Sequence, residues 1–172
     1  KKASVSENIG LAKITINYDR PGVKGREGKI WGTDVEQFWL QDLGFGTSKQ
    51  CPWRAGANDN TTISFSHDVK VEGKELAAGT YGFFIILGES DDILIFSKRN
   101  DAWGSLYYDP AEDILRVSIK HQTVPTSEEW LKYEFTGQTK NSANINLRWE
   151  KRLFAFKVEA DIHKLQLASF TN

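Results

Sequence analysis

The chain of 172 residues contains no methionine, one cysteine and three histidines. The single cysteine, Cys51, excludes an intrachain disulfide and any zinc site built from several cysteines. No apolar run approaches the ~20 residues that a transmembrane helix needs, so the sequence predicts no membrane span. The start at Lys1-Lys2-Ala3-Ser4, without an initiator methionine, is typical of a mature or trimmed N-terminus. This favours an exported protein and leaves a lipid anchor before Lys1 as an alternative, although a cloning boundary would give the same start.

An excess of charge of one sign is also missing. The chain has 22 basic and 23 acidic side chains, for a net charge of −1. Such a balance gives no long-range attraction to nucleic acid or to an anionic membrane, and we expect neither as a partner. Hydrophobic residues make up 40% and charged residues 26%, which argues against disorder. The length fits one domain over residues 1–172, large enough to fold without a disulfide or a metal.

The motifs of common catalytic sites are absent. The sequence has no Gly-x-Ser-x-Gly, no Ser-x-x-Lys and no glycine-rich phosphate loop between a strand and a helix. His67, His121 and His163 lie far apart, and the acidic turns lack the spacing of a calcium loop. We therefore predict no metal and no cofactor. The sequence identifies no catalytic residue, which favours a protein that is not an enzyme without deciding the question.

Alternating apolar and polar residues predict that most of the chain forms β-strands. Two stretches, Tyr81 to Leu87 and Ile93 to Phe96, are apolar on both faces. They indicate central strands whose second face is covered by a loop or a helix. Turn-forming residues separate the strands, so we predict an all-β, antiparallel β-sandwich or jelly roll of about nine to eleven strands. The alternating segments are Leu11 to Tyr18, Thr61 to Ser66, Leu115 to Lys120, Trp130 to Phe135 and Asn144 to Trp149.

Two segments follow helical spacing instead. In Thr33-Asp34-Val35-Glu36, the Glu lies three residues after a Thr that can cap its backbone N–H, which is the pattern of a capping box. Apolar residues at helical spacing follow, and Gly44 suits a helix end. This predicts a short amphipathic helix over residues 34–43. A weaker pattern after Asp161 predicts a short C-terminal helix beyond about residue 160.

Aromatic residues are abundant, with six Trp, five Tyr and ten Phe. Trp31, Trp53 and Trp103 flank turns or lie near strand ends. Exposed aromatic planes can stack on sugar rings, so a carbohydrate-binding module is one hypothesis. The alternative is core packing, because large aromatic side chains dominate burial.

Two turn-rich segments combine glycine or proline with long hydrogen-bond donors. Pro21 and the nearby glycines let the segment from Tyr18 to Arg26 turn sharply and present its basic side chains together. The segment from Pro52 to Thr61 carries Arg54, whose planar guanidinium suits a carboxylate or a phosphate. The structural alternative is that Arg54 pairs with Asp19 or Asp59, while Asn58 closes a turn. The candidate ligand-binding residues are Tyr18, Arg20, Lys24, Arg26, Trp53, Arg54, Asn58 and Thr61.

Three ordered segments form a distinctive combination: Tyr18-x-Arg20-Pro21-x-x-Lys24-Gly25-Arg26, Trp53-Arg54-x-Gly56-Ala57-Asn58-x-x-Thr61 and Leu76-x-Ala78-Gly79-Thr80-Tyr81. From about Ala3 to about Glu159 the chain resembles a bacterial family of exported proteins, domain of unknown function 2911. The resemblance implies a secretion or lipoprotein signal and export to the periplasm or cell surface. It transfers no catalytic residue. The chain departs from the family pattern between Gly32 and Pro52, where it carries a longer insert.

Two functional hypotheses follow. The first is an exported, non-enzymatic binding or structural module that recognises a glycan, a peptide or a cell-envelope component. The alternative is a hydrolase or lyase in which Arg54 stabilises developing negative charge and a carboxylate or His67 moves the proton. This alternative predicts a concave pocket that holds Arg54 together with a titratable group of shifted pKa. The ligand, the strand order and the oligomeric state stay open.

Overall fold

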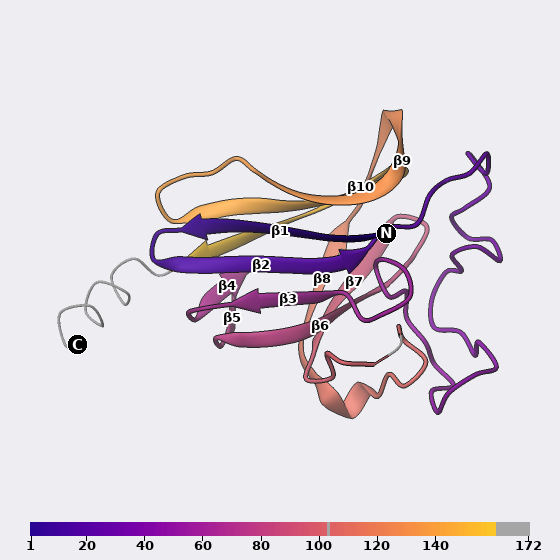
Figure 1. The fold of residues 1–172 in the computed structure, drawn as a ribbon, viewed down its shortest axis with the longest axis horizontal. Coiled ribbons are helices and arrows are strands. Elements are labelled where there is room, and N and C mark those ends of the chain that lie inside the picture. The colour runs from indigo at the N-terminus through magenta and orange to yellow at the C-terminus, as the bar shows by residue number, and fades with distance from the viewer. Residues whose placement is uncertain (103, 161–172) are drawn as a thin grey trace.

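The computed structural model describes residues 1–102 and 104–160. These residues form ten antiparallel strands in two sheets, with one short 3₁₀ helix (Figure 1). The larger sheet has the order β1-β2-β3-β6-β7-β8, and the smaller has the order β5-β4-β10-β9. The elements are β1 (Lys2–Ile9), β2 (Ala12–Asp19), β3 (Thr62–Phe65), β4 (Val69–Val71), β5 (Lys74–Leu76), β6 (Gly79–Ile86), β7 (Asp91–Ser97), η1 (Pro110–Glu112), β8 (Asp113–Lys120), β9 (Gln122–Thr136) and β10 (Ser142–Ala160).

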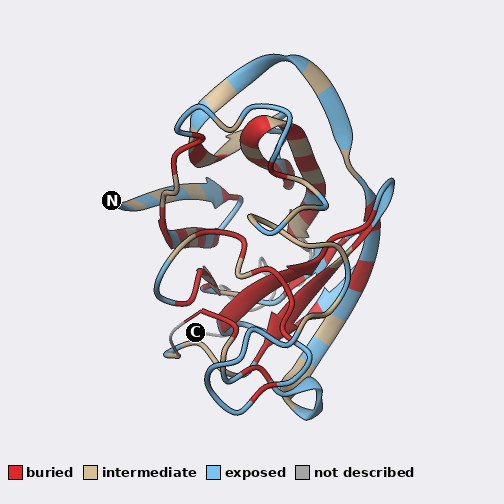
Figure 2. Ribbon diagram, turned by 90° about the vertical axis from the view of Figure 1, so that its right-hand side faces the viewer, coloured by how far each residue is buried: buried red, intermediate tan, exposed pale blue. Residues whose placement is uncertain are grey.

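The two sheets pack against each other through aromatic side chains. Phe83 of β6 stacks on Phe156 of β10 with ring centroids 5.6 Å apart. Tyr18 of β2 meets Tyr133 of β9 edge-on at 4.7 Å. Figure 2 shows the buried residues concentrated on the strands and the exposed ones on the outer connections. Because side chains alternate across a strand, each of these strands supplies one row of residues to the core, as the sequence pattern predicts.

Strands β6 and β7 are central and buried on both faces, as predicted. Their second face carries a small cluster of Phe84, Ile86 and Ile95, and Tyr108 completes it. Leu40 packs against this cluster from the insert between β2 and β3. Irregular loops therefore cover this face of the larger sheet, and they bring the insert against β6.

The helix predicted over residues 34–43 is absent, and that prediction is wrong. The Thr33 hydroxyl accepts the N–H of Val35 at 3.2 Å, and the N–H of Glu36 donates instead to the carbonyl of Ile30. Trp39 adopts a positive φ of 63° and donates its N–H to the carbonyl of Leu87 at 2.8 Å. A left-handed residue cannot continue an α-helix, and long-range hydrogen bonds replace the local ones. The helix predicted beyond residue 160 lies outside the described residues.

A bulge at Glu150 in the middle of β10 connects the smaller sheet to the loop that follows β2. Glu150 has a positive φ of 53°, and the pairing of β10 with β9 shifts register on both sides of it. Its carboxylate accepts hydrogen bonds from the N–H of Gly28 at 2.9 Å, the indole N–H of Trp31 at 2.9 Å and the N–H of Lys151. These contacts hold residues 28–31 at the end of the sheets where the long connections gather (Figure 1). Within the described residues, the structure contains no helix long and apolar enough to cross a membrane.

Candidate functional site

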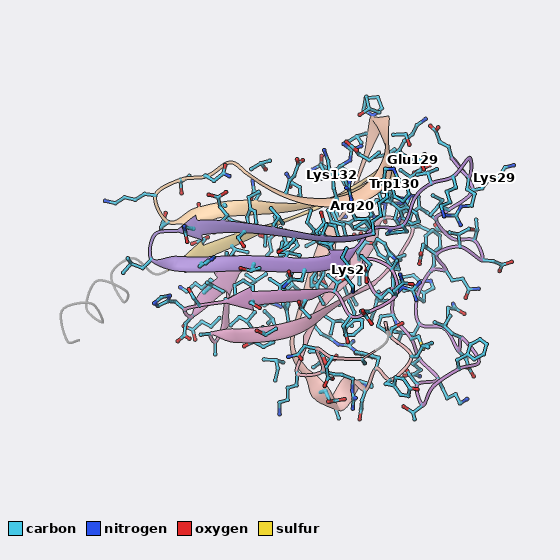
Figure 3. All side chains as sticks on the ribbon, in the orientation of Figure 1. Lys2, Arg20, Lys29, Glu129, Trp130 and Lys132 are labelled. Atoms are coloured by element: carbon cyan, nitrogen blue, oxygen red, sulfur yellow. The ribbon has the colours of Figure 1, made fainter. Side chains whose placement is uncertain are left out.

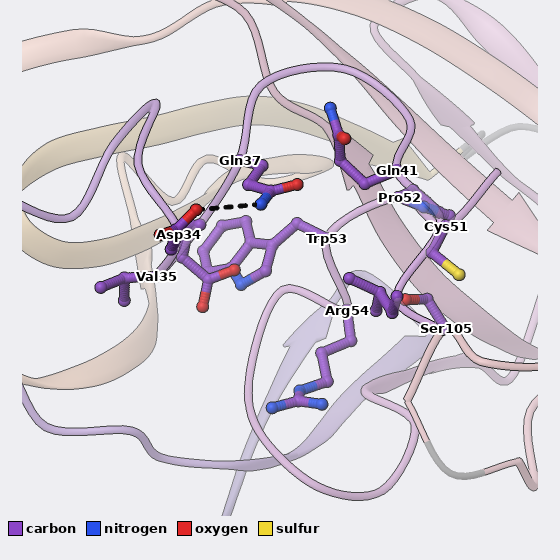
Figure 4. A pocket seen from close by; sticks show the side chains of 11 residues that line it. Asp34, Val35, Gln37, Gln41, Cys51, Pro52, Trp53, Arg54 and Ser105 are labelled. Atoms are coloured by element: carbon purple, nitrogen blue, oxygen red, sulfur yellow. Dashed lines mark hydrogen bonds between the residues drawn. The ribbon is translucent and has the colours of Figure 1, made fainter. Parts of the chain in front are cut away.

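A cavity of about 200 Å³ lies where the insert meets the segment before β3. Its walls come from residues 34–43, from residues 51–54 and from Ser105 in the loop between β7 and β8. Figure 4 shows Trp53 between Asp34 and Gln37 on one side and Arg54 on the other. Apolar residues line the cavity together with the polar ones: Val35, Leu43, Pro52 and Trp53.

The segment that carries Trp53 and Arg54 is held against β6 like a short extra strand. Trp53 and Ile85 exchange two backbone hydrogen bonds, both of 2.9 Å. Gln41 and Cys51 exchange another pair, of 3.1 and 2.7 Å, which closes the base of the insert. The two facing walls of the pocket are therefore fixed by backbone pairing rather than by side chains alone.

The indole of Trp53 belongs to an aromatic cluster inside the molecule. It meets Trp31 edge-on at 5.4 Å and stacks on Trp149 at 6.3 Å, with Phe154 at 5.8 Å. Trp31 and Trp53 thus serve packing, and they offer no open platform for a sugar ring. Trp103 lies outside the described residues. The Trp53 Nε1 atom is buried and makes no hydrogen bond of good geometry with any described residue.

Arg54 reaches the pocket without an internal partner. Its guanidinium makes no hydrogen bond or salt bridge with the residues that the structure describes, and its stem lies beside Gly104. Asp19 and Asp59, the two carboxylates considered as its partners, lie 3.6 and 2.9 Å from the Lys2 ammonium instead. Arg54 is half-buried and lines the cavity, so its guanidinium is available to an external ligand.

Glu36 supplies the pocket with a carboxyl group of altered acidity. Burial raises the pKa of Glu36, while the Arg54 guanidinium, the Trp53 indole N–H and Arg26 lower it, and the balance is a pKa of about 8. Glu36 is therefore largely neutral at pH 7, where an ordinary glutamate is ionised. A neutral carboxyl group can donate a hydrogen bond as well as accept one.

Four of the other predicted site residues form hydrogen bonds with backbone groups and do not line the pocket. Arg20 donates from Nε to the carbonyl of Leu131 at 2.7 Å, and Figure 3 shows it near Trp130 of β9. Arg26 donates to the carbonyls of Val23 and Gly22 at 2.8 and 2.7 Å. The Tyr18 hydroxyl accepts the N–H of Tyr133 at 3.2 Å, and the Thr61 hydroxyl donates to the carbonyl of Ala55 at 3.2 Å. All these hydrogen bonds support the fold, and those of Arg20 and Tyr18 tie β2 and the segment after it to β9.

Lys24 and Asn58 are exposed, and neither lines the pocket. Both adopt positive φ, of 53° and 54°, and so close turns. Of the eight predicted residues, only Trp53 and Arg54 line this cavity, while Tyr18 lines a different, larger one of about 480 Å³ together with Lys2 and Asp19. The structure therefore brings together two of the candidates.

Glu36 is the pocket residue that the sequence did not identify. Its spacing after Thr33 predicted a helix cap, and no motif linked it to Arg54 in another segment. His67, the other candidate for moving a proton, bonds to the hydroxyl of Ser66 at 2.8 Å and does not line the pocket. His163 lies outside the described residues. In the part of the chain that the structure describes, no group of three or more His, Cys, Asp or Glu side chains is arranged to hold a metal.

The comparison with protein families agrees with the resemblance found in the sequence. A family model described as "Protein of unknown function (DUF2911)" matches residues 1–158. The match covers both sheets, the insert and all the residues that line the pocket. No curated protein and no solved structure matches the chain.

Proposed function

We propose that this chain, which belongs to the DUF2911 family of proteins of unknown function, is an exported binding module whose pocket at Arg54 holds a small polar ligand. The observation that carries the proposal is the Arg54 guanidinium, which lines the cavity without a hydrogen bond or salt bridge from any described residue. An arginine offers a rigid, planar set of donors at little entropic cost, because its geometry is already organised for a ligand.

The size of the pocket limits the ligand. Cavities that enclose drug-sized molecules measure roughly 300–1,000 Å³, so a cavity of about 200 Å³ suits a smaller group. A single sugar unit, an amino-acid side chain or the end of a larger cell-envelope molecule is of this order. The mixture of apolar lining residues with few polar groups is typical of a site that orients one end of a ligand.

A hydrolase or lyase is the second candidate, and Glu36 favours it. A carboxyl group with a pKa of about 8 is suited to donate and take back a proton near neutral pH. Arg54 would then stabilise the negative charge that develops on the substrate. Binding remains the better-supported function because the pocket offers only this one titratable group of raised pKa.

Thermal unfolding in the presence of a broad panel of small polar compounds tests the binding proposal. We expect at least one compound to raise the Tm of the wild type and to have at least tenfold lower affinity for Arg54→Gln. Lys13→Ala is the control, because it removes one positive charge from an exposed residue of β2 that does not line the pocket. A compound that stabilises both variants equally would place binding elsewhere.

The same panel separates binding from catalysis. Each compound that binds is incubated with the wild type and with Glu36→Gln, and its conversion is followed by mass spectrometry. Turnover that Glu36→Gln abolishes would establish the second candidate in place of the first.

Export is the part of the proposal that rests on the family resemblance. Cell fractionation of the natural producer, followed by detection of the chain, tests it directly. We expect the chain in the periplasmic or cell-surface fraction, and its recovery with cytoplasmic markers would contradict export.

A further inference from the structure

We infer that the pocket recognises a carboxylate group, held between the Arg54 guanidinium and the carboxyl group of Glu36, which line the same cavity, and that ligand and proton bind together. The inference rests on the proposed function and adds the chemical class of the ligand and its regulation by pH. It follows from which polar groups of the pocket are already occupied and which are not.

Most polar groups on the pocket walls have internal partners. The amide of Gln41 donates to the carbonyl of Phe38 at 2.7 Å, and that of Gln37 donates to Asp34 at 3.4 Å. The thiol of Cys51 donates to the carbonyl of Ser48. After these contacts, the Arg54 guanidinium, the Glu36 carboxyl group and the Trp53 indole N–H remain for a ligand.

The charges around Glu36 favour an anion. Arg54 and Arg26 both act on Glu36, and the Trp53 indole N–H faces it as well. Asp34, exposed at the rim and bonded to Gln37, is the one acidic group that lines the cavity beside Glu36. Since Glu36 itself is largely neutral near pH 7, the inner part of the pocket carries a net positive charge.

A carboxylate matches this arrangement better than a phosphate or a neutral group. The planar guanidinium of Arg54 can bind both oxygens of a carboxylate, or one oxygen while Glu36 donates its proton to the other. A phosphate carries more charge and more acceptor oxygens than one free guanidinium can satisfy, and the donors of Arg26 are committed to Val23 and Gly22. A neutral ligand would leave the Arg54 charge without a counter-charge.

Proton linkage follows from the contact between the two carboxyl groups. Two carboxylates cannot both be ionised at short distance without a large repulsion, so a bound carboxylate raises the pKa of Glu36 further. Above pH 8 the free protein must take up a proton to bind. The affinity should then fall about tenfold for each pH unit above the pKa of Glu36.

NMR titrations test the inference with matched pairs of probes. Propionate is compared with propionamide, and glucuronate with glucose, so that each acid has a neutral counterpart of similar size. The signals followed are the Nε–H of Arg54 and the side-chain carboxyl carbon of Glu36. We expect at least one acid to shift both signals and to bind at least tenfold more tightly than its neutral counterpart. A response to glucuronate alone would identify a sugar acid, and a response to propionate as well would identify any small organic acid.

The pH dependence is measured with Glu36→Gln as the second variant. At pH 6.5 we expect Glu36→Gln to bind the acid within about threefold of the wild type, because the amide also donates a hydrogen bond. At pH 9 the wild type should bind about tenfold more weakly than at pH 6.5, whereas Glu36→Gln should be unchanged. Wild-type affinity that is constant from pH 6.5 to 9 overturns the proton linkage.

The outcomes distinguish a failure of the carboxylate assignment from a failure of the proposed binding function at Arg54. Tighter binding of propionamide, glucose or inorganic phosphate than of the acids overturns the carboxylate assignment and leaves a binding pocket at Arg54. No shift with either acid also overturns the inference. The proposed binding function is overturned by a different result: no compound of the thermal-unfolding panel binds the wild type more tightly than Arg54→Gln.

Discussion

Glu150 illustrates how a single buried carboxylate positions the candidate site. It accepts three N–H groups, two from residues 28–31 and one from Lys151, and it occupies a left-handed bulge in β10. Burial raises the pKa of Glu150, but the hydrogen bonds from Lys151, Gly28 and Trp31 outweigh it and leave that pKa below its ordinary value. Trp31 in turn packs on Trp53 of the pocket wall. Glu150 thus supports the pocket from behind the aromatic cluster.

We expect Glu150→Gln to lower the free energy of unfolding by about 2 kcal/mol at pH 7, because hydrogen bonds to a charged acceptor contribute roughly 1.5–3 kcal/mol. Urea unfolding measures the loss. Glu134→Gln is the control, since Glu134 makes only a part-exposed pair with Lys132 at 3.7 Å and should change stability by less than about 1 kcal/mol.

The pH dependence of the same variant has a definite sign. A lowered pKa stabilises the folded state above the pKa of the unfolded chain, about 4.3, and this contribution disappears as the pH falls through the lower folded value. The difference between wild type and Glu150→Gln should therefore shrink between pH 5 and pH 3. A difference that stays constant down to pH 3 would mean that the charge is not the source of the stabilisation.

At the scale of elements, the insert between β2 and β3 is attached to β6 at few points. Trp39 donates its N–H to the carbonyl of Leu87 just after β6, and Leu40 packs on the cluster behind β6, while Gln41 and Cys51 pair within the insert itself. Because these contacts are sparse compared with a sheet, the insert should open independently of the strands.

We expect Leu40→Ala to loosen the insert at a cost of about 1–2 kcal/mol, less than for a fully buried leucine. Hydrogen exchange should become about tenfold faster at the amides of Trp39, Gln41 and Cys51, and stay unchanged at Phe83 in β6. Leu11→Ala, at the exposed turn between β1 and β2, is the control. Equal acceleration at Phe83 would show that the insert and the sheets unfold together.

The elements were predictable from the sequence where burial repeats with period two. β2, β3, β8, the second half of β9 and most of β10 follow that alternation, and β6 and β7 are apolar on both faces. β4 and β5 have three residues each, too few for a period to appear. The insert was misread because Thr33 and Glu36 have the spacing of a helix cap, whereas backbone pairing with Ile30, Leu87 and Cys51 determines its shape.

The pocket was predictable only in part, because its walls come from segments that the fold brings together. Trp53 and Arg54 belong to a conspicuous turn-rich segment, but nothing in the sequence connects them to Glu36. The bulge at Glu150 can be recognised from the pattern of buried residues along β10. From Ala143 to Trp149 the buried residues of β10 are odd-numbered, and from Glu150 onward they are even-numbered, a change of phase that marks an inserted residue.

For the whole molecule, two glutamates with opposite shifts shape the dependence of stability on pH. Glu150 stabilises the fold less as the medium becomes acidic, while Glu36 costs stability as the medium becomes alkaline. Asp92 acts in the direction of Glu36, since burial raises its pKa, against the opposing effects of the Gly88 N–H, His121 and Arg152. These groups together favour greatest stability in mildly acidic solution.

The contribution of Glu36 can be isolated by Glu36→Gln, which keeps a neutral side chain of the same size. A folded-state pKa of about 8 means that stability due to the neutral Glu36 is complete below the unfolded pKa and is lost as the pH rises towards 8. The slope is at most about 1.4 kcal/mol per pH unit. Glu36→Gln should therefore match the wild type in urea unfolding at pH 4.5 and exceed it in stability at pH 8. A variant that gains stability by losing a carboxyl group would mean that the fold tolerates an unfavourable charge at this pocket, as sites kept for ligand chemistry commonly do. Equal stability at both pH values would place the Glu36 carboxyl in contact with water and remove the basis for proton-linked binding.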